Sequence, residues 1–569
     1  MRTVVGIDLG TTNSLLALLV DGRPEVVPNH EGNLLTPSAV SIDDDDYVLV
    51  GAPALARATT HPEVTATSFK RDMGRSTVRH LGKRSFRPEE LSALVLTELR
   101  RDAERQLGRT IDEALVTVPA YFGELQRRAT RDACEIAELH VERIINEPTA
   151  AALAFGLHEV DRELKAVVLD LGGGTFDVTV LEIMEGVIEI QASAGDSRLG
   201  GDDFLDAMVE TLTGRIGAGW GKVEDPISIA RVRQACERTK RQLTTSQTAR
   251  FVLTGLTTST GTHDLELDLE RAEVEAMWQS LLQRIRAPIR RALRDADQKA
   301  HDIDEVLLVG GATRMPCIAA LASELFGRLP RRDLPPDEAV ALGAAVQAGL
   351  KAGDAAVEDL VVTDVAPFTM GIATAEHLGR QFIDSIYAPI LERGTVLPAS
   401  RMKAFSTLSD NQREVVVQVY QGEHSNCRDN TKLGEYHVKN IPRGRAGEQS
   451  IDVRFTYDLN GVLEVESTIQ ATGEHQAVVF QRTPGALSPA QVKKAREAMA
   501  SLKFHPRESL PNRTALARAD ALYAELSGMD RDMLGDAIQR FRIALETQDE
   551  KLITPLREQL QSLVSQLRP

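Results

Sequence analysis

The sequence predicts a mixed α/β region as far as residue 350, then a strand-rich region and a helical C-terminal region. Strand and helix patterns alternate in the first region, as they do in α/β domains. Short strand-like runs such as REVVVQVYQG and SIDVRFTYDLNGVLEVEST dominate residues 368–482, and helical patterning resumes at Leu487-Ser488-Pro489. We therefore expect domain boundaries near residues 356, 367 and 485.

The first elements follow from local patterns. Residues 3–20 consist of a strand, a glycine-centred turn and a second apolar strand, which predicts a β-hairpin. Residues 88–108 have helical periodicity and end in a glycine at the C-cap position. Residues 113–122 predict a strand that ends at Pro119, and residues 123–139 predict the next helix.

The later regions have their own signals. Residues 357–367 form a short apolar, acidic segment between the α/β and strand-rich regions. Asn460-Gly461, between two strand-like runs, predicts a hairpin turn. The helical region is expected to break near residues 505–512 and at Gly528.

Composition excludes several classes of protein. A chain of 569 residues, 42% hydrophobic and 26% charged, is that of a globular protein with several domains. The net charge of −17 argues against a nucleic-acid surface. No apolar run is long enough to span a membrane, and Asp8 interrupts any signal-like start. The four cysteines are scattered without a C-x-x-C pair, which disfavours a metal or disulfide framework and fits a reducing cytoplasm.

Two stretches repeat one another: VVGIDLGTTNS at 4–14 and AVVLDLGGGTFDV at 166–178. Each is an apolar strand that ends in one carboxylate, Asp8 or Asp170, followed by glycine and hydroxyl residues. Glycine lets backbone N–H groups approach an anion, and a carboxylate beside phosphate makes sense when a hydrated Mg²⁺ lies between them. A single copy would be an ordinary glycine turn, but two copies predict hairpins that hold a triphosphate from both sides. A third glycine pair follows a strand at 305–316, and no P-loop motif occurs.

Many motifs in order carry a resemblance to a known family. Seven motifs resemble the ATPase domain of the heat-shock 70 (DnaK-like) chaperones: VGIDLGTTNS, VTVPAYF, RIINEPTAAALAFGL, LDLGGGTFDV, GDSRLGGDDF, ACERTKRQL and VGGATRMP. PDEAVALGAAVQAGL, FSTLSDNQ and DLNGVLEV resemble that family's linker and peptide-binding domain. The resemblance extends to residue 480, and the short chain is similar to shortened bacterial members of the HscC type.

The resemblance implies a two-lobed actin-like ATPase domain at 1–356, a linker at 357–366, a β-sandwich peptide-binding domain at 367–485 and a helical lid at 486–569. It implies ATP or ADP, Mg²⁺ and K⁺ as cofactors. It also implies a role in protein folding and the stress response, in which ATP hydrolysis controls binding and release of extended apolar segments of unfolded polypeptides. A J-domain co-chaperone is expected. A GrpE-like exchange factor is in doubt, because a stretch usual in the family is missing between Arg75 and Phe86.

The resemblance also assigns roles to residues. Asp8 and Asp170 match the carboxylates that hold Mg²⁺ through its waters. The residues that match catalytic groups are Lys70, Glu147, Asp170, Thr175 and Asp177. The residues that match the nucleotide-binding set are Gly10, Thr11, Thr12, Asn13, Gly172, Gly173, Gly174, Gly201, Glu237, Lys240, Arg241, Thr244, Gly310, Gly311, Arg314 and Asp337. Ala312 stands where the family has a hydroxyl residue, which removes one possible hydrogen bond to the nucleotide.

Coupling and peptide-binding positions are implied in the same way. The residues that match the allosteric set are Pro119, Arg127, Leu360, Val361 and Val362. The residues that match the peptide channel are Ile372, Ala375, Phe405, Leu408, Val415 and Val417, with Ala375 and Leu408 as the two arching residues. Taken singly, each channel position could equally be ordinary sandwich core.

Two other functions are compatible with parts of the chain. One is a sugar kinase or acetate-kinase relative on the same ATPase fold, which would leave residues 368–569 unexplained. The other is a nucleotide-dependent scaffold that docks one fixed partner. ATP hydrolysis stimulated by unrelated unfolded peptides would separate the chaperone from both.

Overall fold

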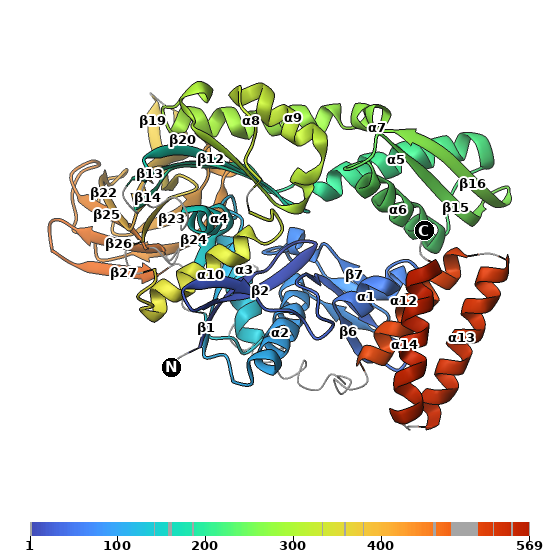
Figure 1. Ribbon diagram of the computed structural model, residues 1–569. Helices are drawn as coiled ribbons and strands as arrows, with labels where there is room; N and C mark the ends of the chain where they lie inside the picture. The colour runs from blue at the N-terminus through green and yellow to red at the C-terminus, as the bar shows by residue number, and fades with distance from the viewer. Residues whose placement is uncertain are drawn as a thin grey trace.

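The structure is a computed structural model of the chain, shown in Figure 1. It describes residues 3–567 apart from 142, 157–161, 185–186, 333, 358–359, 379–380, 459–462, 480–509, 527 and 548–549. Within the described residues, no helix is long and apolar enough to cross a membrane.

The first lobe is built on a sheet of strand order β11-β10-β1-β2-β3, with β4 paired to β2. The predicted N-terminal hairpin is confirmed, because β1 (Val4–Asp8) runs antiparallel to β2 (Asn13–Val20). β10 (Glu113–Val118) runs parallel to β1 and ends just before Pro119, as predicted. The other strands of this sheet are β3 (Arg23–Val26), β4 (Thr36–Pro37) and β11 (Ile144–Asn146).

Helices cover this sheet. The two predicted helices are present as α2 (Pro88–Leu107) and α3 (Glu124–Ile136), and the left-handed Gly108 caps α2 as expected. Their apolar faces bury one core with β1, β2 and β10. The outer part of the lobe consists of β5 (Ala39–Ile42), β6 (Val48–Val50), α1 (Ala52–Arg57), η1 (Pro62–Val64), β7 (Thr65–Thr67), η2 (Phe69–Asp72), β8 (Arg79–Leu81) and β9 (Arg84–Phe86).

The second lobe repeats the plan. β12 (Leu164–Leu171) and β13 (Phe176–Met184) form an antiparallel hairpin, and β12 runs parallel to β17 (Glu305–Val309). The sheet order is β17-β12-β13-β14-β18-β21. The two sequence repeats therefore occupy equivalent places in two similar sheets.

Two helices pack between the lobes: α4 (Glu147–Gly156) and α10 (Ala339–Ala352). Their backbones lie so close that a Cβ on Gly343 would be 1.6 Å from the Ala150 carbonyl oxygen, so only glycine fits there. The remaining elements of this lobe are β14 (Val187–Asp196), α5 (Gly201–Trp220), α6 (Pro226–Gln242), β15 (Thr248–Thr258), β16 (Gly261–Glu270), α7 (Arg271–Met277), α8 (Gln279–Asp295), η3 (Ala300–Asp302), η4 (Gly311–Arg314) and α9 (Pro316–Phe326).

The linker segment adds a strand to the second lobe. β18 (Val361–Val365) pairs in parallel with β14, with Val361 opposite Val187. Leu360 is buried and Val362 packs at the edge of the core of this lobe, whereas the Val361 side chain is 51% exposed. The apolar pattern of the linker is thus explained by its place in the sheet, where Leu360 and Val362 pack against the core of the second lobe.

The strand-rich region folds as two four-stranded sheets packed around one core. The first has the order β20-β19-β23-β24 and the second β22-β25-β26-β27. The predicted hairpin is confirmed in its strands, since Tyr457 pairs with Leu463, while its turn residues Asn460 and Gly461 lie outside the described residues. The strands of these two sheets are β19 (Met370–Leu378), β20 (Gln381–Leu391), β22 (Ala399–Ser406), β23 (Val415–Gln421), β24 (Thr431–Val438), β25 (Ser450–Tyr457), β26 (Leu463–Ile469) and β27 (His475–Val479), with η5 (Cys427–Asp429) before β24. The short strand β21 (Val396–Leu397) instead pairs with β18 in the sheet of the second lobe.

The C-terminal region contains α12 (Leu510–Glu525), α13 (Gly528–Thr547) and α14 (Glu550–Leu567), which share a core of their own. The predicted break at Gly528 is confirmed. The predicted break near 505–512 lies largely outside the described residues, and its last three positions already belong to α12.

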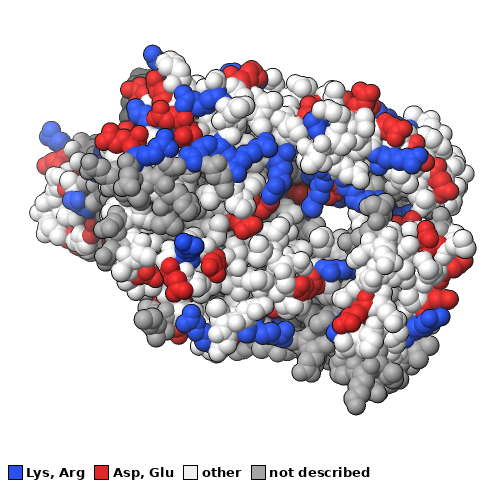
Figure 2. Space-filling view, in the orientation of Figure 1, with Lys and Arg blue, Asp and Glu red and all other residues white. Residues whose placement is uncertain are grey.

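Both later regions dock on the first (Figure 1). The sandwich contacts the lobes through a Tyr121–Phe368 ring contact, with ring centroids 4.5 Å apart, and through the Glu124 N–H, which donates to Gln421 Oε1 at 3.2 Å. The α12 helix lies against α1 at the other end of the molecule. On the face drawn in Figure 2, a row of Lys and Arg borders the junction of the two lobes.

Candidate functional site

The two repeated turns face each other. A Cβ on Gly173 would lie 2.0 Å from Thr12 Oγ1, and a Cβ on Gly174 would lie 2.9 Å from Thr11 Oγ1. The glycines are therefore required where the turn after β12 meets the turn after β1. This close approach of two backbones leaves N–H groups from both lobes available to one anion.

The first turn is braced by two serines that the sequence analysis did not single out. The Gly10 N–H donates to Ser14 Oγ at 3.1 Å, and Ser38 Oγ donates to the Gly10 carbonyl at 2.8 Å. The two hydroxyls are 2.9 Å apart and fully enclosed. Ser14 lies inside the quoted motif and could have been proposed, whereas nothing in the sequence places Ser38, 28 residues after Gly10, beside it.

Four carboxylates gather beside these turns; those of Asp170, Asp177 and Glu147 are buried and that of Asp8 is half-buried. Asp8 ends β1, Asp170 is the last residue but one of β12, Asp177 lies opposite Asp170 on β13, and Glu147 begins α4. Burial, with Glu147 as the next cause, raises the pKa of Asp8 to about 7 and that of Asp177 to about 8. Burial and the neighbouring carboxylates raise the pKa of Asp170 well above its usual range.

One lysine lies among these acids. The Lys70 ammonium is buried and contacts Glu147 Oε1 at 2.6 Å. Thr117 Oγ1 donates to Asp8 Oδ1 at 3.2 Å, and Asp170 Oδ2 has no hydrogen-bond partner among the described residues. Several buried carboxylates with raised pKa values and an unpaired oxygen fit a site that is completed by a cation. The residues present therefore fit a hydrated Mg²⁺ between Asp8 and Asp170.

The lobes are joined across the same turns by pairs that the sequence analysis missed. Arg71 forms a 2.9 Å ion pair with Asp203, and Ser68 Oγ donates to Asp202 Oδ2 at 2.6 Å. Both acids lie in the first turn of α5, and both partners belong to the short segment that carries Lys70. These contacts bring Lys70 of the first lobe to the turn after β12.

The residues expected on the nucleoside side lie together in the second lobe. On α6, Glu237 contacts Lys240 at 2.6 Å and Arg241 at 2.7 Å. A Cβ on Gly201 would lie 3.2 Å from the Ala312 methyl, so α5 and η4 are in contact here. Lys240 and Thr244 also line a small cavity with Met315 and Pro316.

The third glycine pair, Gly310-Gly311, lies between the acid cluster and the residues expected on the nucleoside side. Gly310 has a left-handed φ of 82°, and a Cβ there would lie 2.8 Å from Asp170 Oδ1. Arg314 forms an ion pair with Asp337 at 2.6 Å, and a Cβ on Gly311 would lie 2.5 Å from Asp337 Oδ1. The loop after β17 thus reaches from the buried acids to the α6 residues.

Comparison with known proteins decides the family. A family model described as "Hsp70 protein" matches residues 4–80 and 76–567. The chain belongs to the Hsp70 family. It is also 38% identical over 569 residues to "Chaperone protein DnaK" from Mycoplasma mobile, an alignment that covers 99% of this chain and 92% of that protein.

Membership over the whole chain confirms the predicted fold class and the chaperone function of this Hsp70 protein. ATP hydrolysis, ATP or ADP with Mg²⁺, polypeptide substrates and co-chaperones belong to the Hsp70 family in general. The HscC-type assignment stays a prediction.

In this Hsp70 chain, the predicted coupling positions Pro119 and Arg127 lie between the acid cluster and the linker. Phe122 N–H donates to the Pro119 carbonyl, and the Tyr121 N–H donates to Asp177 Oδ1 at 2.9 Å. Arg127 Nη2 lies 2.5 Å from Asn146 Oδ1, and Asn146 Nδ2 donates to Asp364 Oδ2 of β18 at 2.8 Å. A continuous set of hydrogen bonds therefore leads from the acid cluster to the docked linker.

The six peptide-channel positions of the Hsp70 chain are not equivalent. Ile372 and Val417 are buried in the sandwich core, and Phe405 and Val415 pack against its edge. Ala375 is the half-buried residue at an irregularity of the β19–β20 pairing, and Leu408 is half-buried in the loop after β22. Ala375 and Leu408 are thus the two positions outside the sandwich core.

Proposed function

We propose that this chain hydrolyses ATP at the junction of the two lobes and that hydrolysis controls polypeptide binding in the sandwich. The observation that carries the proposal is the meeting of two glycine turns beside Asp8, Asp170 and the buried Lys70–Glu147 pair. It combines anion-binding backbone, cation-binding carboxylates and a positive charge at one place.

The proposed roles follow from these surroundings. The turns at 10–13 and 172–175 bind the phosphates through backbone N–H groups and the Thr11, Thr12 and Thr175 hydroxyls. Asp8 and Asp170 hold a hydrated Mg²⁺, which when bound neutralises phosphate charge. Lys70 stabilises negative charge that develops at the transferred phosphoryl group, while Glu147 and Asp177 orient the attacking water.

The nucleoside is proposed to lie between α6 and the loop after β17. The residues that would contact the nucleoside on the α6 side are Glu237, Lys240, Arg241 and Thr244. Those that would contact it on the side of the loop after β17 are Gly310, Gly311, Arg314 and Asp337, with Gly201 between the two sets. Thr244 Oγ1 already donates to the Arg241 carbonyl, so it can offer a lone pair to the ligand. The same proposal includes a K⁺ ion, cytoplasmic localisation, a J-domain partner and the domain boundaries at 356, 366 and 485.

Coupling is proposed to run through Pro119, Arg127 and the docked linker. Strand β18 has an exposed edge position at Val361 and a short register with β14, so its docking is a reversible element that ligands can shift. Release of β18 from β14 would change how the sandwich rests on the lobes. Leu408 and Ala375 are proposed to close over an extended peptide held by backbone hydrogen bonds.

The test is ATP turnover by the full chain with and without an unfolded model peptide, in wild type, Lys70→Ala and the exposed-lysine control Lys83→Ala. Lys70→Ala should retain ATP binding but lose hydrolysis by about 100-fold or more, as expected for removing one transition-state charge. Lys83→Ala should behave as wild type. Normal turnover in Lys70→Ala would remove the proposed role of Lys70, and absence of peptide stimulation in wild type would favour a scaffold.

A further inference from the structure

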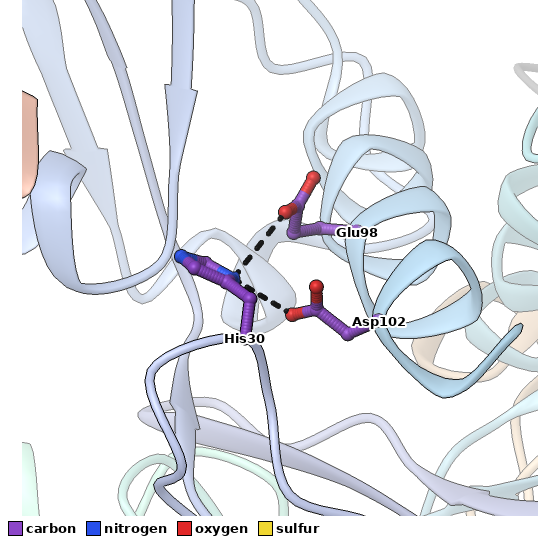
Figure 3. Close-up of side chains that lie close together, drawn as sticks. All are labelled: His30, Glu98 and Asp102. Atoms are coloured by element: carbon purple, nitrogen blue, oxygen red, sulfur yellow. Dashed lines mark hydrogen bonds and ion pairs between the residues drawn. The ribbon is translucent and has the colours of Figure 1, made fainter. Parts of the chain in front are cut away.

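A second cluster of chemically active side chains lies in the first lobe, away from the phosphate-binding turns (Figure 3). His30 comes from the loop between β3 and β4, and Glu98 and Asp102 come from successive turns of α2. His30 Nδ1 lies 3.0 Å from Asp102 Oδ2 and 3.8 Å from Glu98 Oε1. One ligand atom from each residue lies within 4.8 Å of the other two.

The cluster is buried. The side chains of His30, Glu98 and Asp102 are 7%, 11% and 4% exposed. Figure 3 shows the imidazole edge and both carboxylates turned toward a common space. Exposed groups of acids often gather without binding anything, but burying two carboxylates costs free energy that some charge partner must offset.

An independent observation points to an occupant. Asp102 Oδ1 is buried and has no hydrogen-bond partner among the described residues. An imidazole can donate one proton from Nδ1, and that proton goes to the other oxygen, Asp102 Oδ2. A divalent cation would bind the unpartnered Asp102 Oδ1 and offset the charge of this buried carboxylate.

We propose that His30, Glu98 and Asp102 bind one divalent cation of the zinc class. Imidazole nitrogen together with carboxylate oxygen suits Zn²⁺ and neighbouring transition metals, whereas Mg²⁺ prefers oxygen alone. Glu98 and Asp102 are four residues apart on α2, so they lie on one face of the helix, as two ligands of one ion must. The ion binds His30 through Nδ1, so the ring proton lies on Nε2, which is buried and has no hydrogen-bond partner among the described residues. Water completes the coordination.

The position of the site gives it a role in domain docking. Glu31, the next residue after His30, contacts Arg518 of α12 at 2.5 Å. The Asn29 side chain accepts from the N–H groups of Glu31 and Asn33, both at 3.0 Å, so this loop moves as one unit. A cation that ties His30 to α2 would fix the loop on which the C-terminal helices dock.

The experiment measures Zn²⁺ binding by equilibrium dialysis to the metal-stripped, nucleotide-free full chain. The variants are His30→Gln and Asp102→Asn, and the matched control is His437→Gln, an exposed histidine that contacts the carboxylate of Glu414. The wild type and the control should bind one more Zn²⁺ than the two variants, or bind it at least about 10-fold more tightly. Equal binding by all four proteins would overturn the proposal.

A measurement on the wild type alone guards against variants that fail to fold. X-ray absorption at the zinc edge of the one-equivalent complex should show nitrogen and oxygen ligands with a single imidazole. Sulfur ligation would place the ion on a cysteine, and a spectrum without imidazole would place it on the acids near Asp8; either result would overturn the proposal. Hydrogen exchange in residues 27–35 should slow when Zn²⁺ is added to wild type, and not in His30→Gln.

Discussion

Asn146 at the end of β11 donates a 2.8 Å hydrogen bond to Asp364 of the linker strand β18, and Thr149 Oγ1 donates to the same carboxylate oxygen at 3.2 Å. Asn146 directly precedes Glu147, which contacts Lys70. The linker is therefore attached to the chain segment that also carries a member of the acid cluster. We therefore expect linker docking to respond to small movements at the two glycine turns.

Replacing Asp364 should uncouple the two halves of the chain. Asp364→Ala removes the acceptor of the hydrogen bonds from Asn146 and Thr149, and of a local one from the Val365 N–H, and weakens linker docking by about 1–3 kcal/mol. Unstimulated ATP hydrolysis should persist, while its stimulation by peptide falls at least about five-fold. Turnover assays with and without peptide measure this. Asp354→Ala is the control, because Asp354 bonds only to the nearby Ala356 N–H in the interactions described; a variant of Asp364 with full stimulation would contradict the linkage.

The contact between the two glycine turns should be essential for nucleotide binding. Gly173→Ala places a methyl 2.0 Å from Thr12 Oγ1, so the Thr12 side chain must rotate or the two turns must separate. A displacement of this size should weaken ATP binding by about 10-fold or more. Gly214→Ala is the control, since nothing lies within 4 Å of its Cβ position and alanine favours the α5 helix by about 0.5–1 kcal/mol. Calorimetric titration with ATP compares the two variants, and unchanged affinity in Gly173→Ala would show that the turns do not share a ligand.

Glu89 should make stability depend on pH. Burial raises the pKa of Glu89, in the first turn of α2, to about 7, and its Oε2 has no partner among the described residues. The folded state therefore binds the Glu89 carboxyl proton more tightly than the unfolded state does. The contribution of this protonation to the free energy of unfolding is fully present below pH 4.5 and is lost as pH rises to about 7. Glu89→Gln should therefore stabilise the first domain at pH 8, by at most about 3 kcal/mol, and have little effect at pH 4. Thermal unfolding at pH 4 and pH 8 tests this prediction, with the exposed Glu163→Gln as control. Equal unfolding midpoints of Glu89→Gln and wild type at pH 8 would refute the prediction.

Leu408 should contribute to peptide affinity without affecting the rate of unstimulated ATP hydrolysis. It is half-buried in a loop outside the sandwich core, so Leu408→Ser removes apolar area from the proposed channel rather than from the fold. The loss of about 1.5 kcal/mol of apolar contact corresponds to roughly 10-fold weaker binding of an extended apolar peptide. Fluorescence anisotropy measures the affinity, with Met402→Ser as control because Met402 is 52% exposed on β22. Equal effects from both substitutions would argue against a specific role for Leu408.

The sequence by itself determined what depends on local patterns. The paired hairpins after residues 4 and 166, the helix that ends at Gly108 and the break at Gly528 all follow from periodicity and from the backbone freedom of glycine. The repeat of one acid-ending strand was enough to predict two facing turns, which the structure confirms, while a ligand shared by both turns stays a prediction. These features are visible because strand and helix periods and turn residues act over a few neighbouring positions.

Only the tertiary structure decided which distant side chains meet. Four contacts join segments between 28 and 218 residues apart: Ser38 with Gly10, Arg71 with Asp203, Asn146 with Asp364, and His30 with Asp102 of α2. No local sequence pattern predicts contacts over such separations. The same holds for burial: Ile372 and Val417 are buried in the sandwich core, and their place in a peptide channel stays a prediction. Which face of a strand is covered depends on how the sheets pack, because the two faces are equally available to a strand on its own.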